Sequence, residues 1–207
     1  GGVQCWGRNS NGELGDGSTT DRSRAVTVLT SASPSTPLTG VTAIASGRLH
    51  ACALTSAGGV KCWGYNNYGQ LGDGTTTNRN VATDVSGLTS GVAAIAAGQN
   101  HTCARLTVGT VKCWGSNNQG QLGTGNQADS STPVSVSSIA GAVLIAAGPQ
   151  HTCASTSDGA MKCWGYGMNY QLGTGTTSNQ TTPASVLNLS AGVSAISAGY
   201  LNTCALL

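Results

Sequence analysis

The chain has 207 residues, of which 8% are charged, and it carries a formal net charge of +2 with no run of basic residues. Surfaces that bind nucleic acids or anionic membranes carry clustered Lys and Arg, so this composition argues against both partners. No stretch reaches the ~18 consecutive apolar residues of a membrane-spanning helix, so we expect no membrane insertion by this segment.

The composition is typical of turn-rich β structure. The 31 glycines are spread along the chain, Phe is absent, and Ser, Thr and Asn fill the stretches between apolar segments. Composition does not shift from one half to the other, which predicts a single repeat domain over residues 1–207.

One sequence unit recurs about every fifty residues. The segment CWG contains Trp6, Trp63, Trp114 and Trp164, and a glycine that follows a strand of small residues recurs at the same period. The approximate repeats are residues 1–40, 41–91, 92–141 and 142–192, with 193–207 completing the N-terminal half blade. In the first repeat, Thr30 to Pro37 is an insertion that we expect to form a loop.

The order of segments within a repeat predicts four short strands. A strand of small residues is followed by a strand containing Cys, a glycine turn, a strand ending in CWG, a loop containing QLGDG or QLGTG, and a fourth extended segment. Four strands per repeat without a helical period indicate a propeller blade. The fold class is therefore all-β, a β-propeller-type array of four four-stranded blades.

The eight cysteines fit this unit. In a hairpin turning at Ala57, Cys52 lies opposite Cys62 on one sheet face, at a separation that a disulfide can close. One disulfide per blade follows, and metal binding is the less favoured alternative because no CxxC pair is present. The predicted disulfide cysteines are Cys52 with Cys62, Cys103 with Cys113, Cys153 with Cys163, and Cys5 with Cys204.

The last pair lies at opposite ends of the chain. Cys5 has the context of a third strand and Cys204 that of a second strand, so the termini supply two halves of one split blade. The two halves can close a ring within one chain, or they can pair between chains in a head-to-tail fibre. Disulfides of this density indicate an extracellular, secreted or cell-surface setting.

Several repeated side chains have a structural and a functional interpretation. His50, His101 and His151 precede cysteines, with Asn202 in the fourth copy, and we interpret them as satisfying a local backbone turn. The tryptophans are interpreted as packing between blades, with carbohydrate stacking as the alternative. Asp16, Asp21 and Asp73 weakly resemble a calcium loop, but Thr124 and Thr174 replace Asp in the other copies, so no metal site is predicted.

Tyrosines in the Asn-rich loops after CWG are the best candidates for a contact surface, because aromatic side chains with little rotamer entropy suit binding. They are Tyr65, Tyr68, Tyr166 and Tyr170. Asn100, Asn179 and Asn188 stand in glycosylation sequons. No nucleophile elbow, phosphate loop, zinc-protease helix or carboxylate pair is present, so we predict neither an enzyme nor a cofactor.

The assembled motif, GxxHxCALTxxGxVKCWGxNxxGQLGxG, resembles the regulator of chromosome condensation repeat family over essentially the whole chain. The resemblance implies a β-propeller of four-stranded blades whose ring is closed by strands from both termini, commonly with seven blades. The Cys-paired repeat is similar to that of secreted and surface-attached bacterial members.

Three functions follow from these expectations. The first is a non-enzymatic secreted or surface module that binds a protein or a glycan. The second is a structural subunit of an extracellular filament or sheath, built from copies of itself through the split blade. The third, guanine-nucleotide exchange on a small GTPase, is disfavoured by the disulfides.

Overall fold

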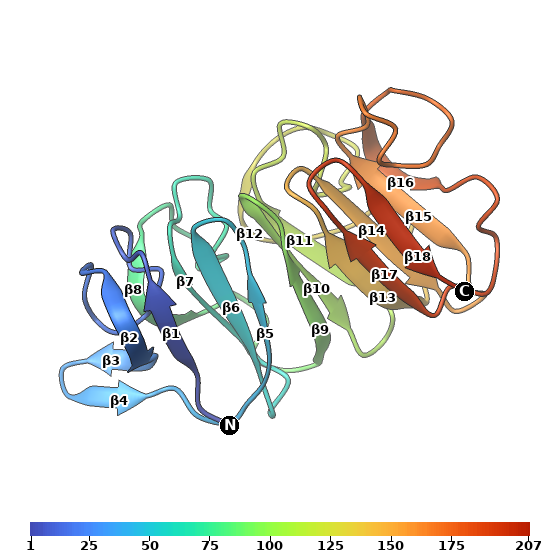
Figure 1. The fold of residues 1–207 in the computed structure, drawn as a ribbon. Coiled ribbons are helices and arrows are strands. Elements are labelled where there is room, and N and C mark those ends of the chain that lie inside the picture. The colour runs from blue at the N-terminus through green and yellow to red at the C-terminus, as the bar shows by residue number, and fades with distance from the viewer.

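The computed structural model describes all 207 residues, and the chain folds into a curved row of small antiparallel sheets (Figure 1). Blade 1, blade 2 and blade 3 each have four strands, and a two-stranded half-blade stands at either end of the row. The structure contains no helix of the length and apolarity that crossing a membrane requires.

The strands of each sheet follow the order of the sequence. The first half-blade consists of β1 (Gln4–Gly7) and β2 (Arg22–Thr27). Blade 1 consists of β5 (Val41–Ser46), β6 (His50–Thr55), β7 (Val60–Gly64) and β8 (Arg79–Asp84). Blade 2 consists of β9 (Val92–Ala97), β10 (His101–Leu106), β11 (Val111–Gly115) and β12 (Ser130–Ser135). Blade 3 consists of β13 (Ala142–Ala147), β14 (His151–Thr156), β15 (Met161–Gly165) and β16 (Gln180–Ser185). The last half-blade consists of β17 (Ala195–Ala198) and β18 (Thr203–Leu206).

The prediction of a fourth blade, formed jointly by strands from the two termini, was wrong. Three blades are complete, and the half-blades that were expected to form one split blade lie at opposite ends of the row (Figure 1). The strands curve through only part of a ring, so β1 pairs only with β2 and β18 only with β17. As a result Trp6 is 67% exposed and Ile44 is 62% exposed, whereas their counterparts inside the row are covered by a neighbouring blade.

The predicted hairpin register is confirmed in all three complete blades. Cys52 pairs with Cys62 and Leu54 with Val60 across β6 and β7, as the period-two alternation requires. The disulfides Cys52–Cys62, Cys103–Cys113 and Cys153–Cys163 join residues whose Cα atoms lie 4.0 to 4.1 Å apart.

Cys5 and Cys204 form no disulfide within the chain, because they lie on the two separated half-blades, and both are free thiols. Burial in the first half-blade raises the pKa of the Cys5 thiol above its ordinary value.

The core is divided between the blade junctions. At the junction of blades 1 and 2, the Cys52–Cys62 disulfide packs with Leu71 against Trp114 of the next blade. At the following junction Cys103–Cys113 packs with Leu122 against Trp164. Two of the three disulfides therefore pack against a tryptophan from the neighbouring blade, whereas Cys153–Cys163 packs with Met161 and Leu172. The interpretation of Trp as inter-blade packing is confirmed for Trp63, Trp114 and Trp164.

The insertion in the first repeat is not a loop. It forms a hairpin of β3 (Leu29–Ala32) and β4 (Ser35–Pro37), and β3 packs beside β8 of blade 1. The mixture of Ser, Thr and Ala with turn residues is compatible with a short hairpin as well as with a loop. Packing of β3 against β8 of the neighbouring blade favours the hairpin.

Removal of one inter-strand disulfide should destabilise the whole row. We expect the double variant Cys103→Ala with Cys113→Ala to lower the free energy of unfolding by about 2–3 kcal/mol, because a ten-residue loop is no longer closed in the unfolded chain. Urea unfolding followed by tryptophan fluorescence measures this difference. The matched control is Cys5→Ser, which removes a thiol that makes no bond; equal losses in both variants would contradict a role for the cross-link itself.

Candidate binding face

Two kinds of connection meet at one end of every blade. The turns between first and second strands, such as 47–49 and 98–100, lie beside the loops that follow the third strands, such as 65–78 and 116–129. Backbone hydrogen bonds of 2.8 to 2.9 Å join them, from Tyr65 N to Leu49 O, from Ser116 N to Asn100 O and from Tyr166 N to Gln150 O. We call this end, formed by both sets of connections in all repeats, the loop face.

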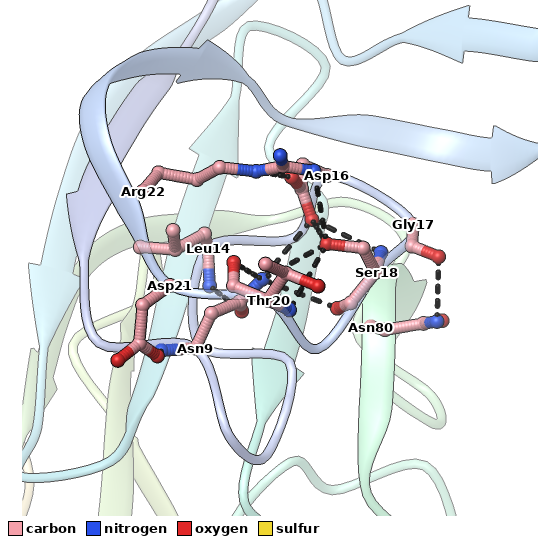
Figure 2. Close-up of polar contacts among 9 residues, drawn as sticks. All are labelled: Asn9, Leu14, Asp16, Gly17, Ser18, Thr20, Asp21, Arg22 and Asn80. Carbon is pink, nitrogen blue, oxygen red and sulfur yellow. Dashed lines mark hydrogen bonds and ion pairs between the residues drawn. The ribbon is translucent and has the colours of Figure 1, made fainter.

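A buried asparagine organises each of the first three long loops. Figure 2 shows Asn9, whose Oδ1 accepts the Leu14 N–H at 2.9 Å while its Nδ2 donates to the carbonyls of Ser18 and Thr20. Asn66 and Asn117 make the same contacts in blades 1 and 2. One side chain thus satisfies several backbone groups that a loop would otherwise leave unpaired, which fixes the conformation of the loop backbone.

The loops are also attached to the next blade. Asn80 of β8 donates from Nδ2 to Gly17 O at 2.9 Å and accepts the Gly17 N–H at its own carbonyl at 2.8 Å (Figure 2). Gly74 and Gly125 donate in the same way to Ser131 and Thr181. The fourth loop departs from this pattern, since Gly167 stands where the first three have Asn.

The acidic residues of these loops serve the loops themselves. Asp16 forms an ion pair with Arg22 at 2.7 Å and accepts hydrogen bonds from Ser18, and Asp73 does the same with Arg79 and Thr75. Although burial opposes ionisation, these hydrogen bonds and the neighbouring arginines hold the pKa of both carboxyls below the usual range. Asp21 caps the Asn9 N–H, so the resemblance to a calcium loop has a structural explanation.

The recurring histidines join adjacent blades. The Nε2 atoms of His50, His101 and His151 lie 2.9 to 3.0 Å from the hydroxyls of Thr102, Thr152 and Thr203 in the following blade. The expectation that these side chains satisfy a local turn was therefore wrong. The Thr that follows His in the motif HTC was the signal available in the sequence, but its partner lies about fifty residues earlier.

The partner contacts fix the histidine tautomer. The Thr102 hydroxyl donates to the backbone carbonyl of Gln70 at 2.9 Å, so it can only accept from His50, whose Nε2 carries the proton. His50 Nδ1 is buried without a partner, as are the Nδ1 atoms of His101 and His151. Burial lowers the pKa of His50 and His151 to about 4 and that of His101 to about 3, with the other two histidines adding to the shift of His101.

The predicted contact tyrosines all lie on the loop face, but they form two separate groups. The rings of Tyr65 and Tyr68 meet edge to face with centroids 6.3 Å apart, and Tyr68 is 40% exposed. Tyr166 lies in the corresponding loop of blade 3. Blade 2 separates it from the first group and has Ser116 at the equivalent position. Tyr170 is exposed and stands, with φ of +62°, where the other copies have Gly12, Gly69 and Gly120.

One group of surface residues escaped the sequence analysis. The residue directly after the recurring glycine at 47, 98, 148 and 199 differs in every repeat. These four residues line a hollow of about 450 Å³ where the innermost strands converge. They are Arg48, Gln99, Pro149 and Tyr200. The change of residue at this position from copy to copy was the signal in the sequence, because the buried Trp and Cys positions of the complete blades keep the same residue.

The three sequon asparagines differ in their surroundings. Asn179 is engaged at both ends of its amide, accepting the Gly167 N–H at 3.0 Å and donating to Gln119 Oε1 at 2.6 Å. Asn100 is half-buried in the turn before β10, and Asn188 is exposed in the turn after β16. Asn188 is the sequon whose side chain is accessible without breaking a loop contact.

The sequence profile of the regulator of chromosome condensation (RCC1) repeat matches residues 57–105, 109–155 and 158–206, and a second profile of that repeat matches 41–70, 92–121 and 142–171. The RCC1 domain-containing protein RUG3, mitochondrial, of Arabidopsis thaliana is 35% identical over 134 residues, which are 64% of this chain and 29% of that protein.

Two solved structures share the fold. Human WBSCR16 superposes with a TM-score of 0.83 at 23% identity, covering 99% of this chain and 53% of that one. Saccharomyces cerevisiae Prp20p, described with its binding properties to Gsp1p and histones, superposes with a TM-score of 0.80 at 22% identity, covering 99% and 51%. The chain spans about half the length of these two chains.

The buried histidines should make unfolding sensitive to mild acid. Because their folded pKa values lie below the unfolded value of about 6.5, the unfolded chain binds more protons, and stability present above pH 6.5 is lost as the pH falls toward about 4. We expect the free energy of unfolding to decrease by about 3–5 kcal/mol between pH 7 and pH 5, measured by urea unfolding.

The matched variant is His101→Asn, which places in blade 2 the residue that the last half-blade has at the equivalent position, Asn202. It removes one of three titrating groups, so the slope of stability against pH should fall by about one third. An unchanged slope would show that other groups cause the acid sensitivity.

Proposed function

Because the chain belongs to the RCC1 repeat family, whose profile covers most of its length, we propose that residues 1–207 act as a non-enzymatic binding module that contacts a macromolecular partner, a protein or a glycan, through the loop face. The carrying observation is the contrast between the two kinds of position in the repeat. Side chains at the blade junctions recur from copy to copy, whereas those exposed on the loop face vary.

The rigidity of the loop face supports this proposal. The buried asparagines, the Asp–Arg ion pairs and the contacts to the next blade hold the loops in one conformation, so little conformational entropy is lost on binding. The binding of Gsp1p and histones described for Prp20p is consistent with protein partners for this fold.

We propose an oxidising location, either secreted or at the cell surface, and this part rests on the cysteines. Three buried disulfides, one in each complete blade, would not persist in a reducing cytosol. The same argument disfavours guanine-nucleotide exchange as the function of this chain.

A filament or sheath subunit is the second candidate, because β1 and β18 each have a free edge. One contact complicates it. At the internal junctions an added Cβ on Gly12 or Gly69 would meet a Cα of the next blade at 2.6 or 2.5 Å, and Tyr170 already carries a side chain at that position. A second copy would therefore have to dock with a shift relative to an internal blade.

The contact face is tested by paired variants at opposite ends of the sheets. Tyr68→Ala should reduce saturable binding of the labelled chain to intact cells of its source by at least tenfold, since it removes an exposed aromatic side chain from a fixed loop. Its melting temperature should change little. Val108→Ala, in the exposed β10–β11 turn at the other end, is the control and should bind normally; equal effects of the two changes would refute the assignment.

Thiol trapping in cells tests the location and the second candidate together. Alkylation before lysis should leave six cysteines protected as three disulfides, with Cys5 and Cys204 alkylated and the chain monomeric on non-reducing gels. Alkylation of all eight cysteines would contradict export. A ladder that collapses on reduction, with Cys5 linked to Cys204 of another chain, would establish the filament subunit instead.

A further inference from the structure

A small cavity lies on the loop face between blade 3 and the last half-blade. It has a volume of about 220 Å³, and its wall includes Tyr166, Tyr200, Pro149, Gln150, Asn169 and Gln171. None of the residues that line it is charged. The cavity therefore combines two phenol rings with three amide side chains.

The amide of Gln171 has an unused donor. Gln171 is 4% exposed, its Oε1 accepts the Asn169 N–H at 2.9 Å, and its backbone carbonyl accepts the Thr203 hydroxyl at 2.8 Å. Its Nε2 is buried and has no hydrogen-bond partner. A buried amide N–H without an acceptor is unfavourable, so an oxygen brought by a ligand would stabilise it.

The equivalent position in blade 2 shows what is missing. There Gln121 donates from Nε2 to the hydroxyl of Ser116 and to Asn118 Oδ1, both at 3.4 Å. Tyr166 occupies the position of Ser116 in the next repeat, as the shared bonds from Ser116 N and Tyr166 N to the preceding turn show. Replacement of Ser by Tyr removes the hydroxyl acceptor and adds an aromatic ring in the same place. Blade 1 shows the same effect, since Tyr65 holds this position there and Gln70 Nε2 is also buried without a partner. Blade 3 differs in that Tyr166 lines a cavity together with Tyr200.

We propose that this cavity binds one neutral hexopyranose unit of a glycan, an assignment that deepens the proposed function and rests on it. The apolar C–H face of the sugar packs on the Tyr166 and Tyr200 rings, and a sugar hydroxyl accepts from Gln171 Nε2. Gln150 and Asn169 supply further neutral donors and acceptors for the remaining hydroxyls.

The lining favours a sugar over the other ligands of a loop face. A charged ligand would lack a counter-charge, and a purely apolar ligand would leave the three amides unpaired. The cavity shares Pro149 and Tyr200 with the neighbouring hollow of about 450 Å³, so the test below includes a peptide, which would need a row of pockets along a groove.

The test uses the whole chain with methyl α- and β-glycosides of glucose, mannose and galactose, followed by saturation-transfer NMR and calorimetric titration. At least one glycoside should bind saturably, and Tyr166→Ser should weaken that binding at least tenfold. This variant should remain folded with an undiminished melting temperature, because its hydroxyl supplies Gln171 with the partner that Ser116 gives Gln121. Tyr200→Ala should lose binding as well, and Val108→Ala should retain it.

Two results would overturn the proposal. The first is the absence of saturation transfer to all six glycosides in a chain that still binds cells through Tyr68, which would leave the proposed function standing. The second is binding of a hexaproline peptide with the same sensitivity to Tyr166→Ser, which would assign the cavity to a peptide.

Discussion

Each junction between blades depends on one backbone carbonyl. The Gln70 carbonyl accepts the Trp114 indole N–H and the Thr102 hydroxyl, both at 2.9 Å, and the Gln121 carbonyl accepts the same pair from blade 3. Because Thr and Trp face each other across paired strands, a single loop atom of one blade fixes the second and third strands of the next. The loop is therefore both the joint between blades and the surface presented to solvent, and a change in loop conformation would disturb the packing behind it.

A disulfide packs beside this joint at both junctions between complete blades. Aromatic residues are only 4% of the sequence and Phe is absent, so each junction between complete blades has a single indole, packed with a cystine and several aliphatic side chains. The cystine is fully buried beside the Trp114 indole that reaches the Gln70 carbonyl. The contact does not require a disulfide, because Trp63 reaches the Glu13 carbonyl at 2.9 Å at the first junction, where Cys5 is a free thiol. The glycine three residues before each His also allows adjacent blades to approach closely. A Cβ on Gly98 would collide with the His101 ring and with the Gly148 carbonyl of the next blade.

The sequence predicted features that depend on local spacing and missed those that depend on rotation between blades. The ten-residue separation of Cys103 and Cys113, with alternation on either side, determined the hairpin register and the disulfide. Ring closure between Cys5 and Cys204 depends on the angle accumulated over all blades, and no short pattern encodes that angle. The role of His101 was missed for a related reason, because its partner Thr152 is adjacent only after two blades have packed. The tyrosine positions were predicted, but Tyr200 was not associated with Tyr166, since they come from consecutive repeats.

Each repeat has junction positions that contact the next blade and turn positions that do not, and this difference explains how a regular scaffold can carry a specific site. A substitution at a junction position, such as Trp114 or Thr102, would break a contact with the neighbouring blade, so the same residue recurs wherever two blades meet. The turn residue after the invariant glycine meets no such demand and can differ in each copy. Tyr166 shows the intermediate case: it replaces a Ser that satisfied Gln121 in the previous repeat, and so leaves a donor unpaired. Tyr65 has the same effect on Gln70 in blade 1. The proposed sugar site therefore depends on the combination found only beside blade 3, where the unpaired amide and the Tyr166 ring line one cavity with Tyr200 of the next repeat.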